Sequence, residues 1–143
     1  MMVIRQQLVD EAMSCLGTPF VHNGRLKGVG LDCAGLVEMT ARALGLYQGV
    51  VIPAYTMSPD PKLMRSILRG NLDEIAFKQI GLADILWFRI TYDPQHLGIV
   101  VGMDPLTIIH ALNSSGRKEV VLTVVHSLWR ERVAGCFRYR GVA

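Results

Sequence analysis

The chain has 143 residues, of which 50% are hydrophobic and 19% are charged, and this balance excludes an intrinsically disordered protein. The length suits one domain with a sizeable core, so we expect a single domain over residues 1–143. The formal net charge is +3, with basic and acidic residues interspersed along the chain, so the composition gives no reason to expect a nucleic-acid partner.

In the first half of the chain, the spacing of hydrophobic residues predicts helices. Apolar residues recur at every fourth position over Val3–Leu16, which predicts an α-helix. The glycine-rich stretch 17–30 predicts a loop, and a second helix is expected over Cys33–Leu44. A third, short helix is expected after Asp60, because an aspartate and then a proline are typical of a helix start.

Beyond Gly81, short runs rich in β-branched and aromatic residues predict strands separated by turns. The five runs are "DILWFRI", "HLGIVVG", "LTIIHAL", "EVVLTVV" and "GCFRYR". We expect consecutive antiparallel strands in a meandering sheet of about five to six strands. The sequence therefore predicts an α+β fold, in which N-terminal helices pack on one face of a C-terminal antiparallel sheet.

The cysteines and the N-terminal residues bear on where the protein resides. Cys15, Cys33 and Cys136 are an odd number without CxxC spacing, so neither a disulfide framework nor a thiolate zinc site is expected, and a reducing compartment fits best. The first residues become charged before an apolar run can develop. We therefore expect no signal peptide and no membrane span, and a protein that is cytoplasmic when synthesised.

Cys33 stands where the loop becomes a helix, which favours a reactive thiol. With Asp32 as the N-cap, Cys33 lies in the first turn, where free backbone N–H groups and the helix dipole lower a thiol pKa. The Asp32 carboxylate would oppose this ionisation, so we expect it to point at the helix amides and away from the sulfur. The alternative is a buried core cysteine, which we favour for Cys15 and Cys136; spacing alone leaves both readings open for Cys33.

Histidine supplies the base that a catalytic cysteine needs. His96 begins one predicted strand and His110 lies near the end of the next, so a hairpin would bring the two imidazoles together at one edge of the sheet. Taken singly, each could instead be a structural histidine with a satisfied hydrogen bond. His22 could line a pocket before the cysteine, and His126 suits a helix start. No HxH or HxxxH pair occurs, so no metal site is expected.

Five motifs together resemble a known family. "GTPFVHNG", "LDCAGLV", "ADILWF", "HLGIVVG" and "IIHA" follow in the order and approximate spacing of NlpC/p60 proteins, which are papain-like cysteine peptidases that cleave bacterial cell-wall peptides. The resemblance extends over residues 17–111. It implies that Cys33 is the nucleophile, that His96 is the general base and acid, and that His110 orients His96. It also implies an NlpC/p60 fold and a reaction without a cofactor or metal.

The same resemblance marks four substrate-binding positions, and three of them depart from the family pattern. Phe20 stands where several members have a tyrosine, and Ala34 where many have a serine. Asp32 is retained from the set that grips the free amino end of a stem peptide. His22 replaces a tryptophan and, like the other three, is expected to border the substrate pocket.

The resemblance thus predicts a cysteine endopeptidase that hydrolyses amide bonds in peptidoglycan stem peptides. Two alternatives stay open: a phage tail or scaffold protein that keeps the fold with little hydrolytic activity, and a Cys/His acyltransferase or amidase. The compact domain is similar to the phage-associated branch of the family, which implies a phage tail protein as a candidate partner and incorporation into a phage or phage-like particle.

Overall fold

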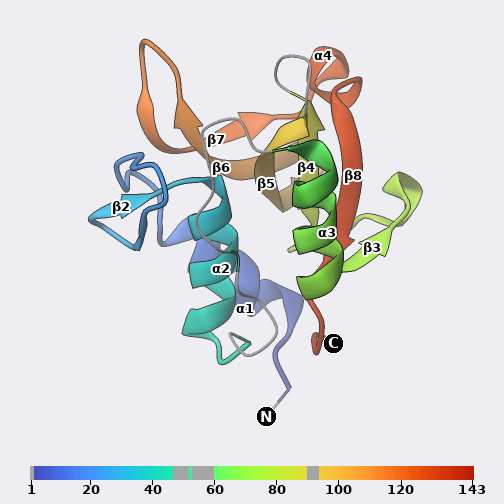
Figure 1. Ribbon diagram of the computed structural model, residues 1–143. Helices are drawn as coiled ribbons and strands as arrows, with labels where there is room; N and C mark the ends of the chain where they lie inside the picture. The colour runs from blue at the N-terminus through green and yellow to red at the C-terminus, as the bar shows by residue number, and fades with distance from the viewer. Residues whose placement is uncertain (1, 47–51, 53–59, 90–93) are drawn as a thin grey trace.

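The computed structural model of the protein describes residues 2–46, 52, 60–89 and 94–143 (Figure 1). Helices and strands in these residues form the α+β fold that the sequence predicts, with a six-stranded antiparallel sheet and a separate two-stranded one.

Three of the helices lie where hydrophobic spacing places them. The helices are α1 (Arg5–Met13), α2 (Cys33–Ala43), α3 (Pro61–Asn71) and the four-residue α4 (Ser127–Arg130). At the start of α3, an Asp60 carboxylate oxygen accepts a hydrogen bond from the Lys62 amide at 2.8 Å, which confirms the predicted cap. After α2 the chain turns at Gly45, whose φ of 81° is a left-handed conformation that glycine adopts without strain. Within the described residues, no helix is long and apolar enough to cross a membrane.

The main sheet is antiparallel throughout, with the strand order β3-β8-β4-β5-β6-β7. Its strands are β3 (Asp73–Ile75), β4 (Ile85–Arg89), β5 (Pro94–Met103), β6 (Leu106–Asn113), β7 (Lys118–Val124) and β8 (Val133–Arg138). The small sheet pairs β1 (Arg25–Leu26) with β2 (Gly30–Leu31) inside the stretch expected to be a loop. Strands of two or three residues are too short to produce a readable alternation, so the sequence did not signal β1, β2 or β3.

The meander prediction is right for β4 to β7 and wrong for β8. After β7 the chain passes through α4 and returns to the far side of β4, where Phe137 faces Ile85 and Cys136 faces Leu86. Phe137 and Cys136 are 0% and 3% exposed, so β8 is covered on both faces. Phe137 belongs to the apolar cluster of one face and Cys136 to that of the other, so the place of β8 beside β4 buries both side chains.

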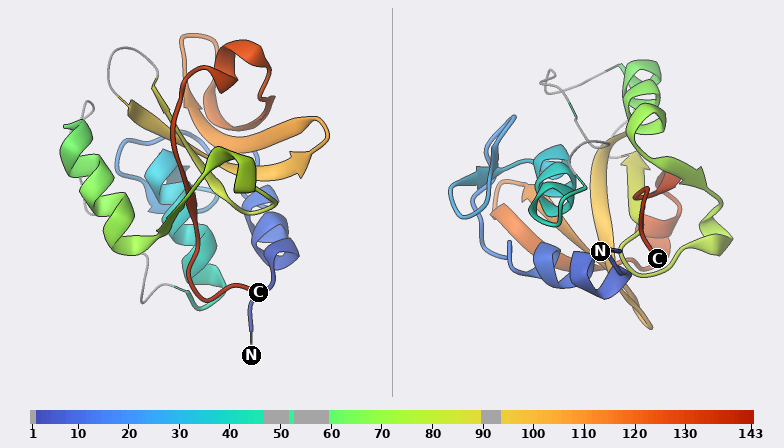
Figure 2. Two further views of the ribbon diagram at one scale, coloured as in Figure 1. Left: turned by 90° about the vertical axis from the view of Figure 1, so that its right-hand side faces the viewer. Right: turned by 90° about the horizontal axis from the view of Figure 1, so that it is seen from below.

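The two faces of the sheet carry separate apolar clusters. On one face, α1, α2 and α3 cover alternate residues of the central strands, represented by Trp87 and Ile99 (Figure 2). On the other face, Phe88 and Val100 pack with Trp129 of α4. The longer helices thus lie on one face, as predicted, and α4 helps to cover the other.

Asp84, which precedes β4, links three parts of the fold. Its buried carboxylate forms ion pairs with Arg138 of β8, at 2.8 Å, and with Arg5 of α1, at 3.2 Å. It also accepts a hydrogen bond from the Gly81 amide at 2.8 Å. With both oxygens occupied inside the protein, Asp84 has a structural role.

Candidate active site

The site begins at the first turn of α2. Asp32 is the N-cap, and its Oδ1 accepts a hydrogen bond from the Gly35 amide at 2.7 Å, as predicted. Cys33 is the first residue of the helix and is 6% exposed. The thiol therefore lies at the electropositive end of an eleven-residue helix, where a negative charge is favoured.

Gly35 is required by close approach of the preceding loop. A Cβ atom at this position would lie 2.0 Å from the Gly24 carbonyl oxygen, far inside van der Waals contact. The glycine two residues after Cys33 thus lets the loop at 23–25 press against the start of α2, and this contact holds the residues around the cysteine in place.

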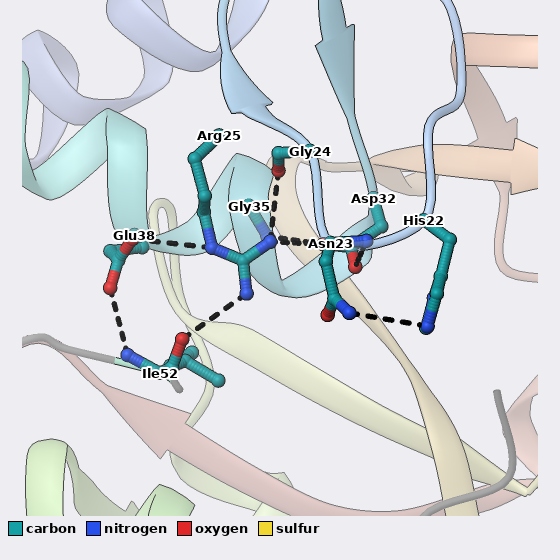
Figure 3. A network of polar contacts seen from close by, with 8 residues as sticks. All are labelled: His22, Asn23, Gly24, Arg25, Asp32, Gly35, Glu38 and Ile52. Atoms are coloured by element: carbon teal, nitrogen blue, oxygen red, sulfur yellow. Dashed lines mark hydrogen bonds and ion pairs between the residues drawn. The ribbon is translucent and has the colours of Figure 1, made fainter. Parts of the chain in front are cut away.

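The Asp32 carboxylate is turned inward and is fully engaged (Figure 3). It is 2% exposed, and Oδ2 accepts a hydrogen bond from the Asn23 amide at 2.8 Å. Oδ1 pairs with an Nη of Arg25 at 2.8 Å. The guanidinium charge offsets that of the carboxylate, and this reduces the obstacle that Asp32 presents to ionisation of the neighbouring thiol.

Arg25 extends the network to the middle of α2, which the sequence analysis missed (Figure 3). Its Nε lies 3.3 Å from Glu38, a residue that is only 4% exposed. Glu38 also accepts the Ile52 amide at 2.8 Å, while the Ile52 carbonyl accepts from Arg25 at 3.2 Å. The available signal was an acidic residue amid the apolar run "GLVEMTA", since a buried carboxylate requires a partner.

The two histidines meet as predicted. His96 of β5 and His110 of β6 are joined by a hydrogen bond of 2.6 Å between His96 Nε2 and His110 Nδ1. They lie diagonally across the strand pair, on the face where Gly98 separates them, and a Cβ at Gly98 would come within 2.7 Å of the Ile108 side chain. The small residue in "HLG" therefore leaves space for side chains of the neighbouring strand.

A third polar residue completes a chain of hydrogen bonds. His110 Nε2 lies 2.7 Å from Thr123 Oγ1 on β7, and His110 is 0% exposed. Nothing in the sequence pattern singled out Thr123. The register Ile108–Thr123 places this hydroxyl diagonally beside His110, but that register becomes visible only once the strands are paired.

Aromatic rings lie against the imidazole pair. Trp129 lies edge-on to His110 at 5.6 Å between ring centroids, and Phe88 lies 6.3 Å from His96. Burial lowers the pKa of both histidines, and the pKa of His96 is lowered further by the adjacent His110. Both rings are consequently neutral near pH 7, as a proton acceptor must be.

The helix that begins with Cys33 packs against both histidine-bearing strands, β5 and β6. The structure thus joins His96 to His110 and puts Cys33 on a helix that packs on their strands. The two imidazoles lie against Phe88 and Trp129, which belong to the face of the sheet opposite α2, so direct convergence of the sulfur with His96 stays a prediction.

The four residues expected to bind substrate differ in exposure. Phe20 is half-buried against the main core, and His22 is exposed, with Nε2 lying 3.2 Å from the Asn23 side-chain nitrogen. Ala34 is 0% exposed and Asp32 nearly so, which leaves them little surface for a ligand. Substrate contact at all four positions stays a prediction, and Phe20 and His22 have the exposed surface for it.

His126 lies outside the proposed site, and the possibility of a metal site is separate from it. His126 is the N-cap residue of α4, which agrees with its predicted position at a helix start. In the part of the chain that the structure describes, no three His, Cys, Asp or Glu residues are grouped in a way that could hold a metal ion.

An antiparallel sheet with three helices on one face is the fold of NlpC/p60 domains, and the fold of this chain is of that class. The NlpC/p60 domain of the peptidoglycan hydrolase SagA is 22% identical, with a TM-score of 0.67 over 94% of this chain and 98% of that domain. An NlpC/P60 family protein from Bacillus cereus has a TM-score of 0.71 at 19% identity, over 97% of this chain and 41% of the other. NlpC2 from Trichomonas vaginalis has a TM-score of 0.67 at 19% identity, over 94% and 46%.

Sequence comparison gives a related result. The chain is 27% identical to a gamma-DL-glutamyl hydrolase of Bacillus subtilis over 137 residues, which is 92% of this chain and 29% of that protein. This chain therefore spans less than a third of the length of that relative. No family model matches the sequence.

Proposed function

We propose that the protein is a cysteine endopeptidase that hydrolyses an amide bond at a γ-linked glutamyl residue of peptidoglycan stem peptides. The observation that supports it most is the hydrogen-bonded chain His96–His110–Thr123, because the helix that begins with Cys33 packs on the strands of the two histidines. Such a chain orients a base, and a base beside a thiol at a helix start is the machinery of nucleophilic acyl transfer.

The hydrogen-bond chain decides which tautomer can act. When His110 Nε2–H donates to Thr123 Oγ1, His110 Nδ1 is an acceptor and takes the Nε2–H of His96. His96 Nδ1 then carries a lone pair and is the nitrogen that faces Cys33 in this proposal. The reverse polarity would put a proton on Nδ1 and remove the base, so Thr123 acts as the acceptor.

The reaction then needs no other reagent than water. His96 takes the Cys33 proton as the sulfur attacks the amide carbonyl, and the backbone N–H groups at the start of α2 stabilise the oxyanion. The C–N bond breaks as His96 gives that proton to the leaving amine, which leaves a thioester. Water attacks the thioester with His96 as base, the C–S bond breaks, and a carboxylic acid and the free thiol are released.

The substrate follows from the named relatives and from the changed pocket. One relative is a gamma-DL-glutamyl hydrolase and one structural neighbour is a peptidoglycan hydrolase, and the proposed substrate combines the two as a γ-glutamyl bond in a cell-wall peptide. Asp32 is tied to Arg25 and Asn23, while Phe20 and Ala34 lack hydroxyl groups. A substrate bound without an amine-gripping set would be cut within a chain as readily as at its end. Separately, we propose that the protein has a phage tail protein as its partner and is incorporated in a phage or phage-like particle.

Incubation of the purified protein with isolated sacculi and with γ-linked glutamate oligomers tests the proposal. Mass spectrometry should find fragments that carry one added water at a γ-glutamyl bond. Products joined to an added amine in place of water would show an acyltransferase instead. Intact substrates from both sources, with a thiol that iodoacetamide does not alkylate, would contradict an enzymatic role and leave the scaffold alternative.

Thr123→Val tests the role of the hydroxyl as a positioning group. We expect kcat/KM to fall about 10- to 100-fold, the equivalent of roughly 1–3 kcal/mol for a buried donor without an acceptor. The acid limb of the pH profile should move to lower pH, because the hydroxyl no longer stabilises a protonated imidazole pair. Thr123→Ser should restore both values. The matched control is Thr107→Val on β6, which removes a hydroxyl that donates to the Pro105 carbonyl. This variant should change neither kcat/KM nor the pH profile.

A further inference from the structure

One side of α3 and the neighbouring strand β4 enclose a hollow that the proposed reaction does not use. We call it the α3 hollow, and it is lined by Pro61, Lys62, Arg65, Ser66, Arg69 and Trp87. Trp87 is part of the face of the sheet that α2 also covers, and its neighbour Phe88 lies opposite His96 in the β4–β5 register. Since consecutive strand residues point to opposite faces, the hollow lies on the face of the sheet that α2 covers, and the imidazole pair lies on the other face with Phe88.

The lining of the α3 hollow is positively charged. It includes three cations and no carboxylate. Arg65 and Arg69 share the carboxylate of Glu74, at 3.0 and 2.8 Å. The Lys62 ammonium has no ion-pair partner among the described residues. Asp60, the helix cap, has one oxygen on the Lys62 amide. Three cations beside two carboxylates leave a surplus of positive charge, which would attract an anion.

Trp87 adds a second, independent feature. The residue is 0% exposed, and its indole Nε1–H has no acceptor in the described part of the chain. A buried donor without a partner costs about 1–3 kcal/mol and is rare in folded proteins, so it requires an explanation. The Arg65 guanidinium lies over the indole ring, 4.9 Å from its centroid, so a cation covers the face of the ring that bears this donor.

We propose that the α3 hollow binds the free α-carboxylate of a γ-linked glutamyl residue in the substrate. A glutamate joined through its γ-carboxyl group keeps its α-carboxylate ionised at neutral pH, so each such residue presents an anion beside the chain. That anion accepts the Trp87 N–H and pairs with Lys62 and Arg65, in which case the unsatisfied donor gains its acceptor. The choice of a γ-linked glutamyl substrate rests on the proposed function. The positive charge of the hollow and the unpaired Trp87 N–H are features of the structure and do not depend on that proposal.

Binding is measured on the Cys33→Ala protein, so that hydrolysis cannot interfere. The probe is a γ-linked pentaglutamate, titrated into ¹⁵N-labelled protein while the two indole N–H resonances are followed, with Trp129→Phe assigning the Trp87 signal. We expect the Trp87 signal to move downfield and saturate. Lys62→Glu should weaken binding about ten-fold, because it replaces an attraction by a repulsion. Lys78→Glu is the matched control, because Lys78 is exposed on the 3-10 turn 77–79 and away from the hollow lining, and it should weaken binding far less.

Two further probes separate the possible results. A pentamer with its α-carboxylates converted to carboxamides should not bind, and an L-alanyl-γ-D-glutamyl stem tripeptide should compete for the site. Whichever carboxylate probe binds more tightly identifies the source, a glutamate polymer or the cell wall. An unmoved Trp87 signal, equal affinity for the carboxamide, or equal losses in Lys62→Glu and Lys78→Glu would overturn the inference. If the probe binds but the unmodified enzyme cleaves nothing, the proposed function fails and the anion site stands.

Discussion

Replacing Cys33 by alanine is expected to abolish hydrolysis, with kcat lowered by about 10⁶-fold, as when a covalent nucleophile is removed. Without the sulfur no thioester can form, and His96 has no acidic proton to take. The measurement is the rate of fragment release from γ-glutamyl peptides. Cys33→Ser should be nearly as inactive, because a hydroxyl at the same position ionises far less readily than a thiol.

Cys136→Ala provides the matched control for this prediction. Cys136 is 3% exposed, and burial raises its pKa to about 11, so it should neither react with iodoacetamide at pH 7 nor contribute to catalysis. The unmodified protein should take up one alkyl group, and Cys33→Ala none. If Cys33→Ala kept a substantial fraction of the parent rate, the cysteine mechanism would be wrong.

The imidazole pair could be predicted because it depends on local topology. A hairpin brings the start of one strand beside the end of the next, so His96 and His110 had to be neighbours once β5 and β6 were recognised. The cap at Asp32 is equally local, because a side chain reaches only the amides two or three residues ahead. In both cases, contacts within a short stretch of chain decide the geometry.

The position of β8 and the pairing of Asp32 with Arg25 depend instead on contacts between residues far apart in the sequence. Residues that face each other across β4 and β8 are about 50 positions apart, and the alternation of Cys136 and Phe137 does not say which strand they pair with. Arg25 reads as one charged residue in a glycine-rich loop. Its contact with Glu38 depends on the short β1–β2 pair, which has too few residues to leave a pattern. The position of β8 and the Arg25 contacts depend on packing between distant parts of the chain, and for that reason they could not be predicted from the sequence.

These non-local contacts answer the question of why a carboxylate stands next to the proposed nucleophile. A free Asp32 would raise the thiol pKa and oppose the chemistry. Arg25 holds Asp32 at 2.8 Å and Glu38 at 3.3 Å, so one cation serves two carboxylates that are 2% and 4% exposed. The guanidinium thus has two effects, on the stability of the first turns of α2 and on the charge beside Cys33.

Arg25→Met should therefore destabilise the protein by about 3–5 kcal/mol, because it leaves two buried carboxylates without their counter-ion. That loss is a large part of the roughly 5–15 kcal/mol by which domains are stable, so urea unfolding at pH 7 should show a much lower midpoint. Arg117→Met is the matched control: its pair with Glu119 is exposed, and its removal should cost about 1 kcal/mol or less. Equal midpoints for the two variants would show that Arg25 carries no more weight than a surface cation, and the explanation for the buried Asp32 would fall with it.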